Sequence, residues 1–231
     1  MKYYINEKYF DYINTEEKAY WLGFIFADGC IDKQRKNLII NLAIKDYEHL
    51  RRFHQSIETN RPVGYAKDNR YVYSRISNKH LVNSLILCGC IPKKSLILKF
   101  PSKDIVPEHL LKHFIRGYFD GDGCISTILR KRKNKISPTM DCEVNFLGTF
   151  DMLSNILKNL PIQPLKIFNF GKIYKFKTNN KKIIIDILDY LYQDSHIFLE
   201  RKYQKYISNV KSFITKRHPL NSLIPVTTTV E

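Results

Sequence analysis

The sequence predicts an α+β protein of two similar halves, in which a pair of central helices is flanked by antiparallel sheets. The first observation is a repeat: YWLGFIFADGC (20–30) and IRGYFDGDGC (115–124) are both apolar, and both run into Asp-Gly-Cys-Ile. The second observation is that each copy is followed by signals for two strands, a helix, two strands and a helix. Such internal repetition indicates an architecture more strongly than any single element does.

Composition favours a folded protein with a polyanionic partner. The chain has 231 residues, 44% of them hydrophobic, which is enough for one large domain or two small ones with a real core. Its 38 Lys and Arg exceed its 22 Asp and Glu, giving a net charge of +16. The Tyr and Phe interleaved with the basic residues favour nucleic acid over a membrane surface. The simpler alternative is a basic protein whose charge only keeps it in solution.

Signals for export, membrane insertion and metal-binding thiols are weak. No apolar run reaches the roughly 18 residues that span a bilayer, and the N-terminal MKYYINEKYF has no apolar signal core. Five cysteines form no pairing framework, which indicates a reducing, intracellular setting. Cys88 and Cys90 are too close for a common zinc motif, and His109 and His113 have no third ligand. Neither pair therefore predicts a metal site.

The first half begins with a helix that Thr15 can cap and that starts at Glu16, because Thr at this position accepts a backbone hydrogen bond. Gly29 follows its expected end, where a left-handed glycine can terminate a helix. The elements expected next are a strand over 37–46, a helix with Leu50, Phe53 and Ile57 on one face, strands over 63–67 and 71–76, and a helix over 78–88.

Pro107 can start the central helix of the second half, which Gly123 ends as Gly29 ends the first. The elements expected next are a basic hairpin arm over 127–140, a strand over 141–148, a helix over 151–160, a strand pair turned at Gly171, and a helix over 181–192. A linker over 92–107 holds three prolines. We therefore expect an N-terminal half over 1–100, a C-terminal half over 101–211 and a loosely ordered tail over 212–231.

The two central helices carry small residues one turn apart. These residues are Gly23 and Ala27 in the first helix and Gly117 and Gly121 in the second. Small side chains at this spacing let two helix backbones approach closely, although a single such motif would indicate only ordinary core packing. If the helices pack together, Asp28 and Asp122 meet at one end of the seam.

That end has a specific chemistry. The last carbonyls of a helix lack partners and carry partial negative charge, and two carboxylates added to them form a cluster of hard oxygen donors. Such a cluster suits Mg²⁺, which could activate a water for phosphodiester hydrolysis. The alternative is that Asp28 and Asp122 are only polar residues at helix ends.

The segments Trp21–Gly29 and Ile115–Gly123 resemble the nine-residue signature of the LAGLIDADG homing endonucleases. The agreeing residues are Gly23, Ile25, Ala27, Asp28 and Gly29 in the first copy, and Gly117, Asp120, Asp122 and Gly123 in the second. Phe26 replaces the first acidic residue of the signature, which Asp120 keeps. The resemblance covers most of the chain, and it implies that family's fold, with saddle-shaped antiparallel sheets beside the paired helices.

The resemblance also implies an activity: hydrolysis of both strands of a long, asymmetric DNA site to leave a staggered cut. Asp28 and Asp122 would be the metal ligands, each with the carbonyl of the preceding residue, Ala27 or Gly121, nearby. The implied cofactor is Mg²⁺, with Mn²⁺ as a substitute and Ca²⁺ as an ion that binds without supporting cleavage.

Members of the family place one basic residue per half near the scissile phosphates. Aligning CIPKKSL (90–96) with LERKYQ (199–204) pairs Lys94 with Lys202, and we expect these two lysines to take that role. Each alone is as well explained as a surface charge. A polar residue at the end of the second strand often organises solvent in the family, and Lys45 fits that place, although its counterpart is about Gly148.

A two-stranded ribbon fits the major groove of DNA, and each expected sheet has polar outward positions. Arg and Asn can read base edges, whereas Lys more often contacts phosphates. The expected contacts are Lys33, Arg35, Asn37, Asn41, Lys67, Arg70, Tyr73 and Arg75 in the first half, and Arg130, Arg132, Lys135, Asn145, Lys166, Lys172, Lys175 and Lys177 in the second. Individually these are ordinary solvated positions, but the arm LRKRKNK (129–135) is hard to explain without a polyanion.

The leading interpretation is a metal-dependent DNA endonuclease. Two alternatives have the same fold: an RNA maturase, whose partner is intron RNA, and a DNA-binding regulator that has lost cleavage. The presence of both Asp28 and Asp122 favours cleavage. A structural nucleic-acid-binding protein would explain the charge but not the paired Asp-Gly ends. Because the halves differ in sequence, we expect a monomer. It would act with the genome, in a bacterial or phage-infected cytoplasm or an organelle, and be encoded in an intron, an intein or a free-standing frame.

Overall fold

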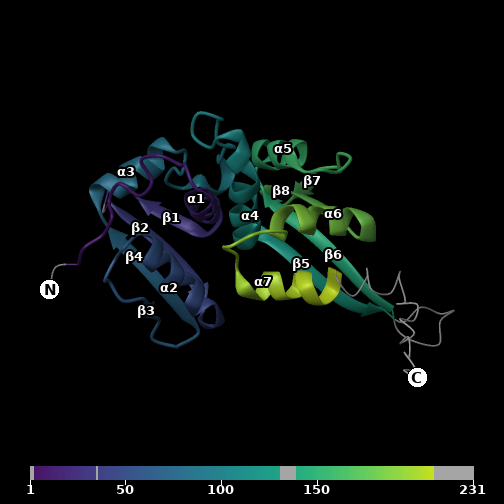
Figure 1. The fold of residues 1–231 in the computed structure, drawn as a ribbon, viewed down its shortest axis with the longest axis horizontal. Coiled ribbons are helices and arrows are strands. Elements are labelled where there is room, and N and C mark those ends of the chain that lie inside the picture. Colours follow the sequence, from purple (N-terminus) through teal and green to yellow (C-terminus); the bar gives the residue numbers. More distant parts are fainter. Residues whose placement is uncertain (1–2, 35, 131–138, 211–231) are drawn as a thin grey trace, which may run out of the picture.

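Two halves lie side by side in the computed structural model (Figure 1). It describes residues 3–34, 36–130 and 139–210, and only the backbone of 128–130, 139–140 and 209–210. Much of the expected basic arm and the expected tail after 212 lie outside the described residues. No helix within the described ranges is long and apolar enough to cross a membrane.

The predicted order of elements is present in each half. The N-terminal half contains α1 (Glu16–Asp28), β1 (Gly29–Asp32), β2 (Asn37–Ala43), α2 (Tyr47–Ser56), β3 (Gly64–Tyr65), β4 (Tyr71–Ser77) and α3 (Lys79–Leu87). The C-terminal half contains α4 (Leu111–Asp122), β5 (Gly123–Arg130), β6 (Thr139–Gly148), α5 (Phe150–Asn159), β7 (Phe168–Phe170), β8 (Ile173–Thr178), α6 (Lys181–Tyr192) and α7 (Glu200–Lys205). Short 3₁₀ turns cover Ile44–Asp46, Lys94–Leu96 and Glu108–Leu110.

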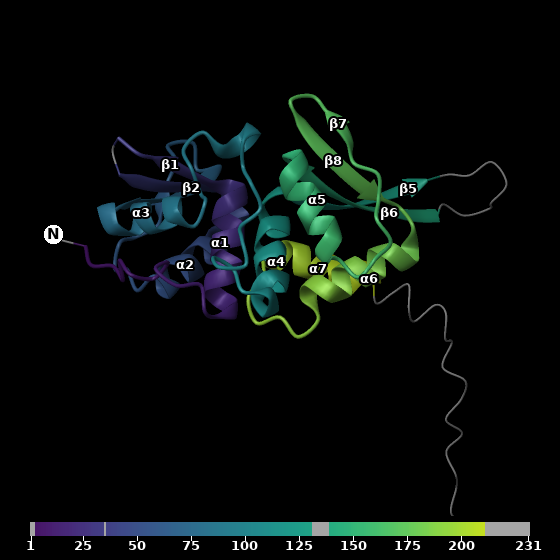
Figure 2. The ribbon, with the colours of Figure 1, turned by 90° about the horizontal axis from the view of Figure 1, so that it is seen from above.

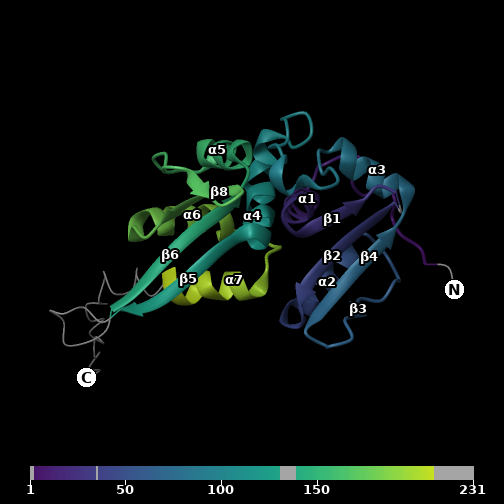
Figure 3. The same cartoon turned by 180° about the vertical axis from the view of Figure 1, so that it is seen from behind.

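Each half carries one antiparallel four-stranded sheet, in the orders β1-β2-β4-β3 and β5-β6-β8-β7. In β4, Val72, Ser74 and Ile76 are buried and alternate with exposed residues, as expected for a sheet with one covered face. Helices α2 and α3 pack on the first sheet, and α5 and α6 on the second. The two sheets lie on either side of the central helices. Figure 3 looks onto the open face of each sheet, which points away from its packed helices.

The central pair α1 and α4 packs backbone against backbone (Figure 2). A Cβ added at Gly23 would overlap the Phe114 carbonyl oxygen, and one at Gly117 would overlap the Tyr20 carbonyl oxygen. One turn further along, a Cβ at Gly121 would overlap the side chain of Ala27. The structure thus places all four predicted small residues at the helix interface.

The expectation of left-handed glycines at the helix ends is wrong. Gly29 and Gly123 have φ values of −76° and −83°, and they are the first residues of β1 and β5. A Cβ would lie 2.6 Å from the carbonyl oxygen of Ile25 at Gly29, and 2.6 Å from that of Phe119 at Gly123. Glycine is therefore needed for space, because the chain passes directly from each helix into a strand. The predicted cap of α1 is present, with Thr15 Oγ1 accepting from Lys18 N at 3.2 Å.

His49 of α2 lies in the core of the N-terminal half. Its ring packs 4.8 Å from those of Trp21 and Phe24, and its Nε2 lies 3.1 Å from the Tyr20 hydroxyl. That hydroxyl donates its proton to Asp120, so His49 Nε2 must be the donor to Tyr20. Burial lowers the pKa of His49 to about 3, so the ring stays neutral in the folded protein.

Replacing Gly117 by alanine should destabilise the protein by about 3 kcal/mol or more, because the helix backbones must move apart to admit one methyl group. Chemical unfolding would measure the loss. The exposed Lys158 of α5 provides the control, since Lys158→Ala should change stability little. Equal stabilities for the two variants would contradict backbone contact between α1 and α4.

The neutral burial of His49 makes stability depend on pH. The folded pKa of about 3 lies below the ordinary 6.5, so only the unfolded chain gains this proton as pH falls from 6.5 towards 3. The free energy of unfolding should therefore fall on acidification, by up to about 1.4 kcal/mol per pH unit from this group. Urea unfolding between pH 7 and 4.5 should show a shallower fall in His49→Gln. The variant His109→Gln, at an exposed position, should behave like wild type.

Candidate active site

Asp28 and Asp122 occupy the last positions of α1 and α4, where the close helix contact brings the two ends together. The Asp28 carboxylate rests against the opposite half, because its Cγ and Oδ2 would lie 3.4 Å from a Cβ at Gly121. Asp122 is half-buried, and Asp28 keeps one exposed edge while protein crowds its other sides. Two carboxylates from different halves thus share one small region.

The negative charge of Asp28 and Asp122 is not fully balanced by the neighbouring cations. Burial and the charge of Asp28 together raise the pKa of Asp122 to about 6. Burial also raises the pKa of Asp28, although nearby cations oppose the shift. Among the described residues, no three His, Cys, Asp or Glu side chains gather as a metal cluster. The oxygen donors here are instead two carboxylates and backbone carbonyls, which suit a hard divalent ion with open positions for water and substrate.

Lys94 and Lys202, which sequence alignment pairs, reach equivalent places. Lys94 Nζ donates to the carbonyl of Ala27 at 3.0 Å. Lys202 Nζ donates to the carbonyls of Asp120 at 2.8 Å and Gly121 at 3.5 Å, and also to those of Phe119 and Gly123. The residues are only 8% and 3% exposed, so neither is an ordinary surface charge.

Each motif aspartate is influenced most strongly by the lysine of the other half. Among the cations that lower the pKa of Asp28, Lys202 ranks first, and for Asp122 the first is Lys94. Lys94 and Asp122 also line one cavity of about 160 Å³. Two composite centres result: Asp28 with the Gly121 backbone and Lys202, and Asp122 with Lys94, whose amine binds the Ala27 carbonyl. Each takes residues from both halves.

Solved structures match the fold of this chain over most of its length. The LAGLIDADG meganuclease I-AabMI, bound to uncleaved DNA, gives a TM-score of 0.62 at 13% identity, covering 86% of this chain and 92% of that one. The LAGLIDADG homing endonuclease I-LtrWI, bound to target DNA, gives 0.63 at 11% identity, covering 94% of each. The protein has the LAGLIDADG homing endonuclease fold. The α+β architecture predicted from the two motifs is thereby confirmed.

A further similar structure was determined with calcium ions present. I-SmaMI, bound to an uncleaved DNA target in the presence of calcium ions, gives a TM-score of 0.61 at 13% identity and covers 90% of this chain and 95% of that one. No family model matches the sequence.

Curated relatives match only in part. An uncharacterised protein of Methanocaldococcus jannaschii is 24% identical over 152 residues, 64% of this chain and 56% of the relative. A probable translation initiation factor IF-2 of that organism is 28% identical over 168 residues, 71% of this chain and 13% of the relative. The chain spans about half of the first relative and a small part of the second, so nothing known of the whole relatives is carried over to it.

No contact among the described residues places Lys45 beside Asp28 or Asp122. It is exposed in the 3₁₀ turn Ile44–Asp46, directly after β2, and it bonds to neither aspartate. Its counterpart Gly148 packs under the hydroxyl of Tyr118, leaving no room for a side chain. The solvent-organising role of Lys45 stays a prediction.

The open sheet faces carry many of the predicted DNA contacts. Asn41, Tyr73 and Arg75 are exposed on paired positions of β2 and β4, and Tyr73 covers Gly64 of β3. On the second sheet, Lys177 and Lys175 lie 2.9 and 3.7 Å from the carboxylate of Glu143. The exposed predicted residues outside the strands are Lys33, Lys67, Arg70, Lys166 and Lys172. Arg35, Arg132, Lys135 and the side chain of Arg130 lie outside the described residues.

Asn37 and Asn145 lie on the outward sides of their strands, as predicted, but they are not the solvated positions that were expected. They are 8% and 6% exposed although they lie on the outward sides of β2 and β6. Each stands between two strands, and its neighbours cover it; Asn145 Nδ2 also donates to Glu143 Oε1 at 3.4 Å. Glu143 itself went unpredicted, because a carboxylate is not expected on a basic DNA-binding face.

Asp120, which keeps the first acid of the LAGLIDADG signature, is a fully buried hub. Its carboxylate accepts hydrogen bonds from the hydroxyls of Tyr20 and Tyr192 at 2.7 and 2.6 Å, and from Leu199 N at 2.7 Å. These bonds join α4 to α1, to α6 and to the start of α7, which carries Lys202. The sequence motif singled out Asp120, but it did not predict these partners.

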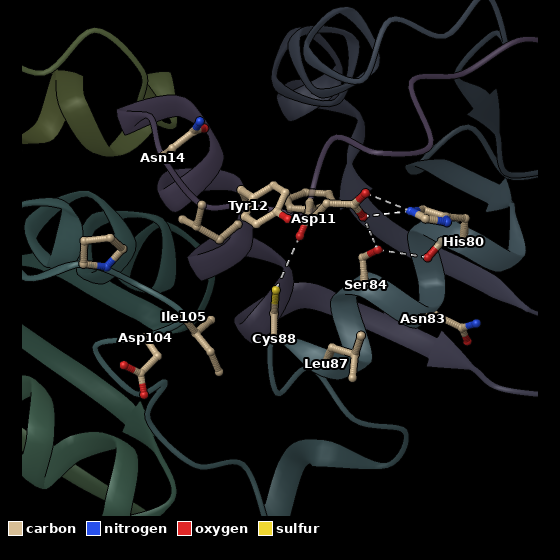
Figure 4. A pocket seen from close by; sticks show the side chains of 13 residues that line it. Asp11, Tyr12, Asn14, His80, Asn83, Ser84, Leu87, Cys88, Asp104 and Ile105 are labelled. Carbon is tan, nitrogen blue, oxygen red and sulfur yellow. Dashed lines mark hydrogen bonds and ion pairs between the residues drawn. The ribbon is translucent and has the colours of Figure 1, made fainter.

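Another cavity has none of the candidate active-site residues in its lining, and Figure 4 shows the side chains that line it. It has a volume of about 650 Å³ and lies between residues 10–14, α3 and residues 104–107. Asp11 at its edge pairs with His80 at 2.8 Å and accepts from Ser84 Oγ at 2.6 Å. Neither motif aspartate lines it.

The raised pKa of Asp122 predicts a gain in stability when its charge is removed. Between the ordinary 3.8 and the folded value of about 6, the unfolded chain loses this proton first, so the ionised carboxylate destabilises the folded state above pH 6. In the absence of divalent ions, Asp122→Asn should raise the melting temperature at pH 7.5 by roughly 2–8 °C, for about 1–2 kcal/mol after solvent screening. The gain should vanish near pH 3.5. Asp104→Asn, at an exposed carboxylate, should leave the melting temperature unchanged.

Proposed function

We propose that this chain is a site-specific double-stranded DNA endonuclease that hydrolyses one phosphodiester bond in each strand and leaves a staggered cut. The observation that carries the proposal is the pair of composite centres, each with an aspartate, the backbone of the other half and a buried lysine. Two equivalent centres match a substrate with two backbones. The similar structures bound to DNA support the choice of substrate.

Asp28 with the Gly121 carbonyl, and Asp122 with the Ala27 carbonyl, would hold divalent ions, since few protein oxygens with open positions suit Mg²⁺. When bound, the ions would supply activation of a water and stabilisation of the leaving oxygen. The calcium-containing I-SmaMI structure supports the use of divalent ions. We expect Mn²⁺ to substitute for Mg²⁺, and Ca²⁺ to bind without supporting cleavage.

Lys94 and Lys202 would stabilise the negative charge that builds on each phosphate. Burial lowers the pKa of Lys202 to about 8, partly opposed by Asp120, so its amine stays mainly protonated at neutral pH. A fixed charge in a site with little water stabilises a transition state without reorganising at the moment of reaction. Holding these amines in place is therefore part of the chemistry.

The open sheet faces would bind the duplex on either side of the centres. Ribbons of this kind fit the major groove, and the exposed Arg75 and Asn41 can read base edges while Lys177 meets phosphates. The two faces differ in sequence, so the proposed site is asymmetric and the active form a monomer. This substrate would place the protein with the genome.

Cleavage of a randomised duplex library, with Mg²⁺ or with EDTA, tests the proposal. Wild type should cut one long asymmetric sequence only with the metal. Asp28→Asn and Asp122→Asn should each lose cutting by at least about 100-fold while still binding that sequence, because they remove the ligand and keep the shape. Asp104→Asn is the matched control and should cut normally.

Other outcomes distinguish the competing interpretations. Specific binding without cutting under any divalent ion would overturn the endonuclease and favour a regulator of the same fold. If neither cutting nor specific DNA binding occurs, the proposal fails, and intron RNA becomes the next ligand to assay.

A further inference from the structure

An ion pair joins the two halves beside the candidate active site. Arg201 Nε donates to both carboxylate oxygens of Asp46, at 3.1 and 3.0 Å. Arg201 directly precedes Lys202 in α7, whereas Asp46 belongs to the other half and directly precedes α2. Asp46 stands at the N-cap of α2 but forms no capping bond there, and only 6% of it is exposed. Its carboxylate is thus committed to Arg201.

A second contact mirrors the first. Thr149 directly precedes α5, at the place in the C-terminal half that Asp46 takes in the N-terminal half. Its hydroxyl donates to the carbonyl of Leu98 at 2.6 Å, and Leu98 N donates to the carbonyl of Lys94 at 2.8 Å. Thr149 also lines the cavity that contains Lys94 and Asp122. It therefore reaches the segment that carries the lysine of the N-terminal half.

The two contacts follow one rule. Asp46 and Thr149 each directly precede the helix that follows the second strand of their own half. Each bonds to the segment that carries the buried lysine of the other half. The lysines then bind carbonyls of their own halves, Ala27 for Lys94 and Gly121 for Lys202. Both lysines are thereby fixed from two sides. A bridge that only joined the halves could lie anywhere along their interface, whereas both of these end at a lysine segment.

We propose that Asp46 and Thr149 are positioning residues: through Arg201 and Leu98 they fix Lys202 and Lys94, and each serves one of the two DNA strands. The inference rests on the proposed endonuclease function and deepens it. A displacement of about 1 Å in a charged group can cost 100-fold in rate, so loss of one bridge slows mainly the centre whose lysine it holds.

Strand-resolved cleavage tests this assignment. The substrate is a duplex carrying the selected site and a different label on each strand, and the rate of nicking is followed for each strand separately. Asp46→Asn should slow one strand by about tenfold or more and change the other less than about twofold, and the slowed strand should be the one slowed by Lys202→Met. Thr149→Val should slow the opposite strand, in common with Lys94→Met, and Thr149→Ser should restore it.

The variants separate positioning from other effects. Combining Asp46→Asn with Arg201→Gln should slow the strand no more than the stronger single change. Thr149 Oγ1 also caps α5 by accepting from Met152 N, and Asn180→Ala removes a similar cap from α6 as a control. Neither Asn180→Ala nor Glu48→Gln, which removes an exposed ion pair of α2, should slow either strand.

A measurement without DNA keeps the test independent of nuclease activity. Lysine acylation by acetic anhydride, mapped by mass spectrometry, reports how accessible each amine is. Asp46→Asn should raise the labelling of Lys202 by about threefold or more and leave Lys94 unchanged, and Thr149→Val should do the reverse. Equal slowing of both strands, the same slowed strand for both variants, or unchanged labelling would overturn the proposal. If wild type cuts no duplex, the proposed function fails, and labelling alone decides the positioning.

Discussion

The contact of α1 with α4 at Gly23 and Gly117 sets the rest of the structure. Two helices of ordinary side chains would pack with their axes farther apart. Here backbone meets backbone, so the helix ends converge and Asp28 comes to rest against Gly121. Converging ends also bring together two carboxylates and two sets of helix-end carbonyls, all of negative sign, and Lys94 and Lys202 donate to several of these carbonyls. The raised pKa of Asp122 is the electrostatic cost of this packing, and apolar burial along the helices offsets it.

Symmetry of the backbone does not extend to the chemistry around the lysines. Asp120 ties α4 to α1, α6 and α7, and it stands where the other half has the buried Phe26. Lys202 therefore donates to several carbonyls beside the buried Asp120, whereas Lys94 donates to one carbonyl and lines a cavity with Asp122. In α1, Phe26 takes the place that Asp120 has in α4, and it packs against Phe114 of α4, with ring centroids 5.2 Å apart.

Much of this could be predicted from the sequence, because it follows from local rules. The order of elements, the Thr15 cap, the small residues of the helix pair and the alignment of Lys94 with Lys202 all depend on spacing within short segments. The failures are equally physical. Gly29 departs from its expected left-handed form because the fold runs straight into β1, and Asn37 is covered by neighbours that only strand register brings close. The bond between Asp46 and Arg201 joins residues 155 positions apart, and nothing local marks either residue.

Composite centres explain why one chain carries both motifs. Each centre takes its aspartate from one half and its lysine and backbone carbonyl from the other, so a single half holds no complete centre. Docking of α1 on α4 therefore builds the two centres together, and neither can form without the other. A few glycines and buried polar hydrogen bonds fix the packing of α1 on α4. Residues on the open sheet faces take no part in that packing. The strands can then diverge in sequence to suit an asymmetric duplex while the helix ends keep their geometry.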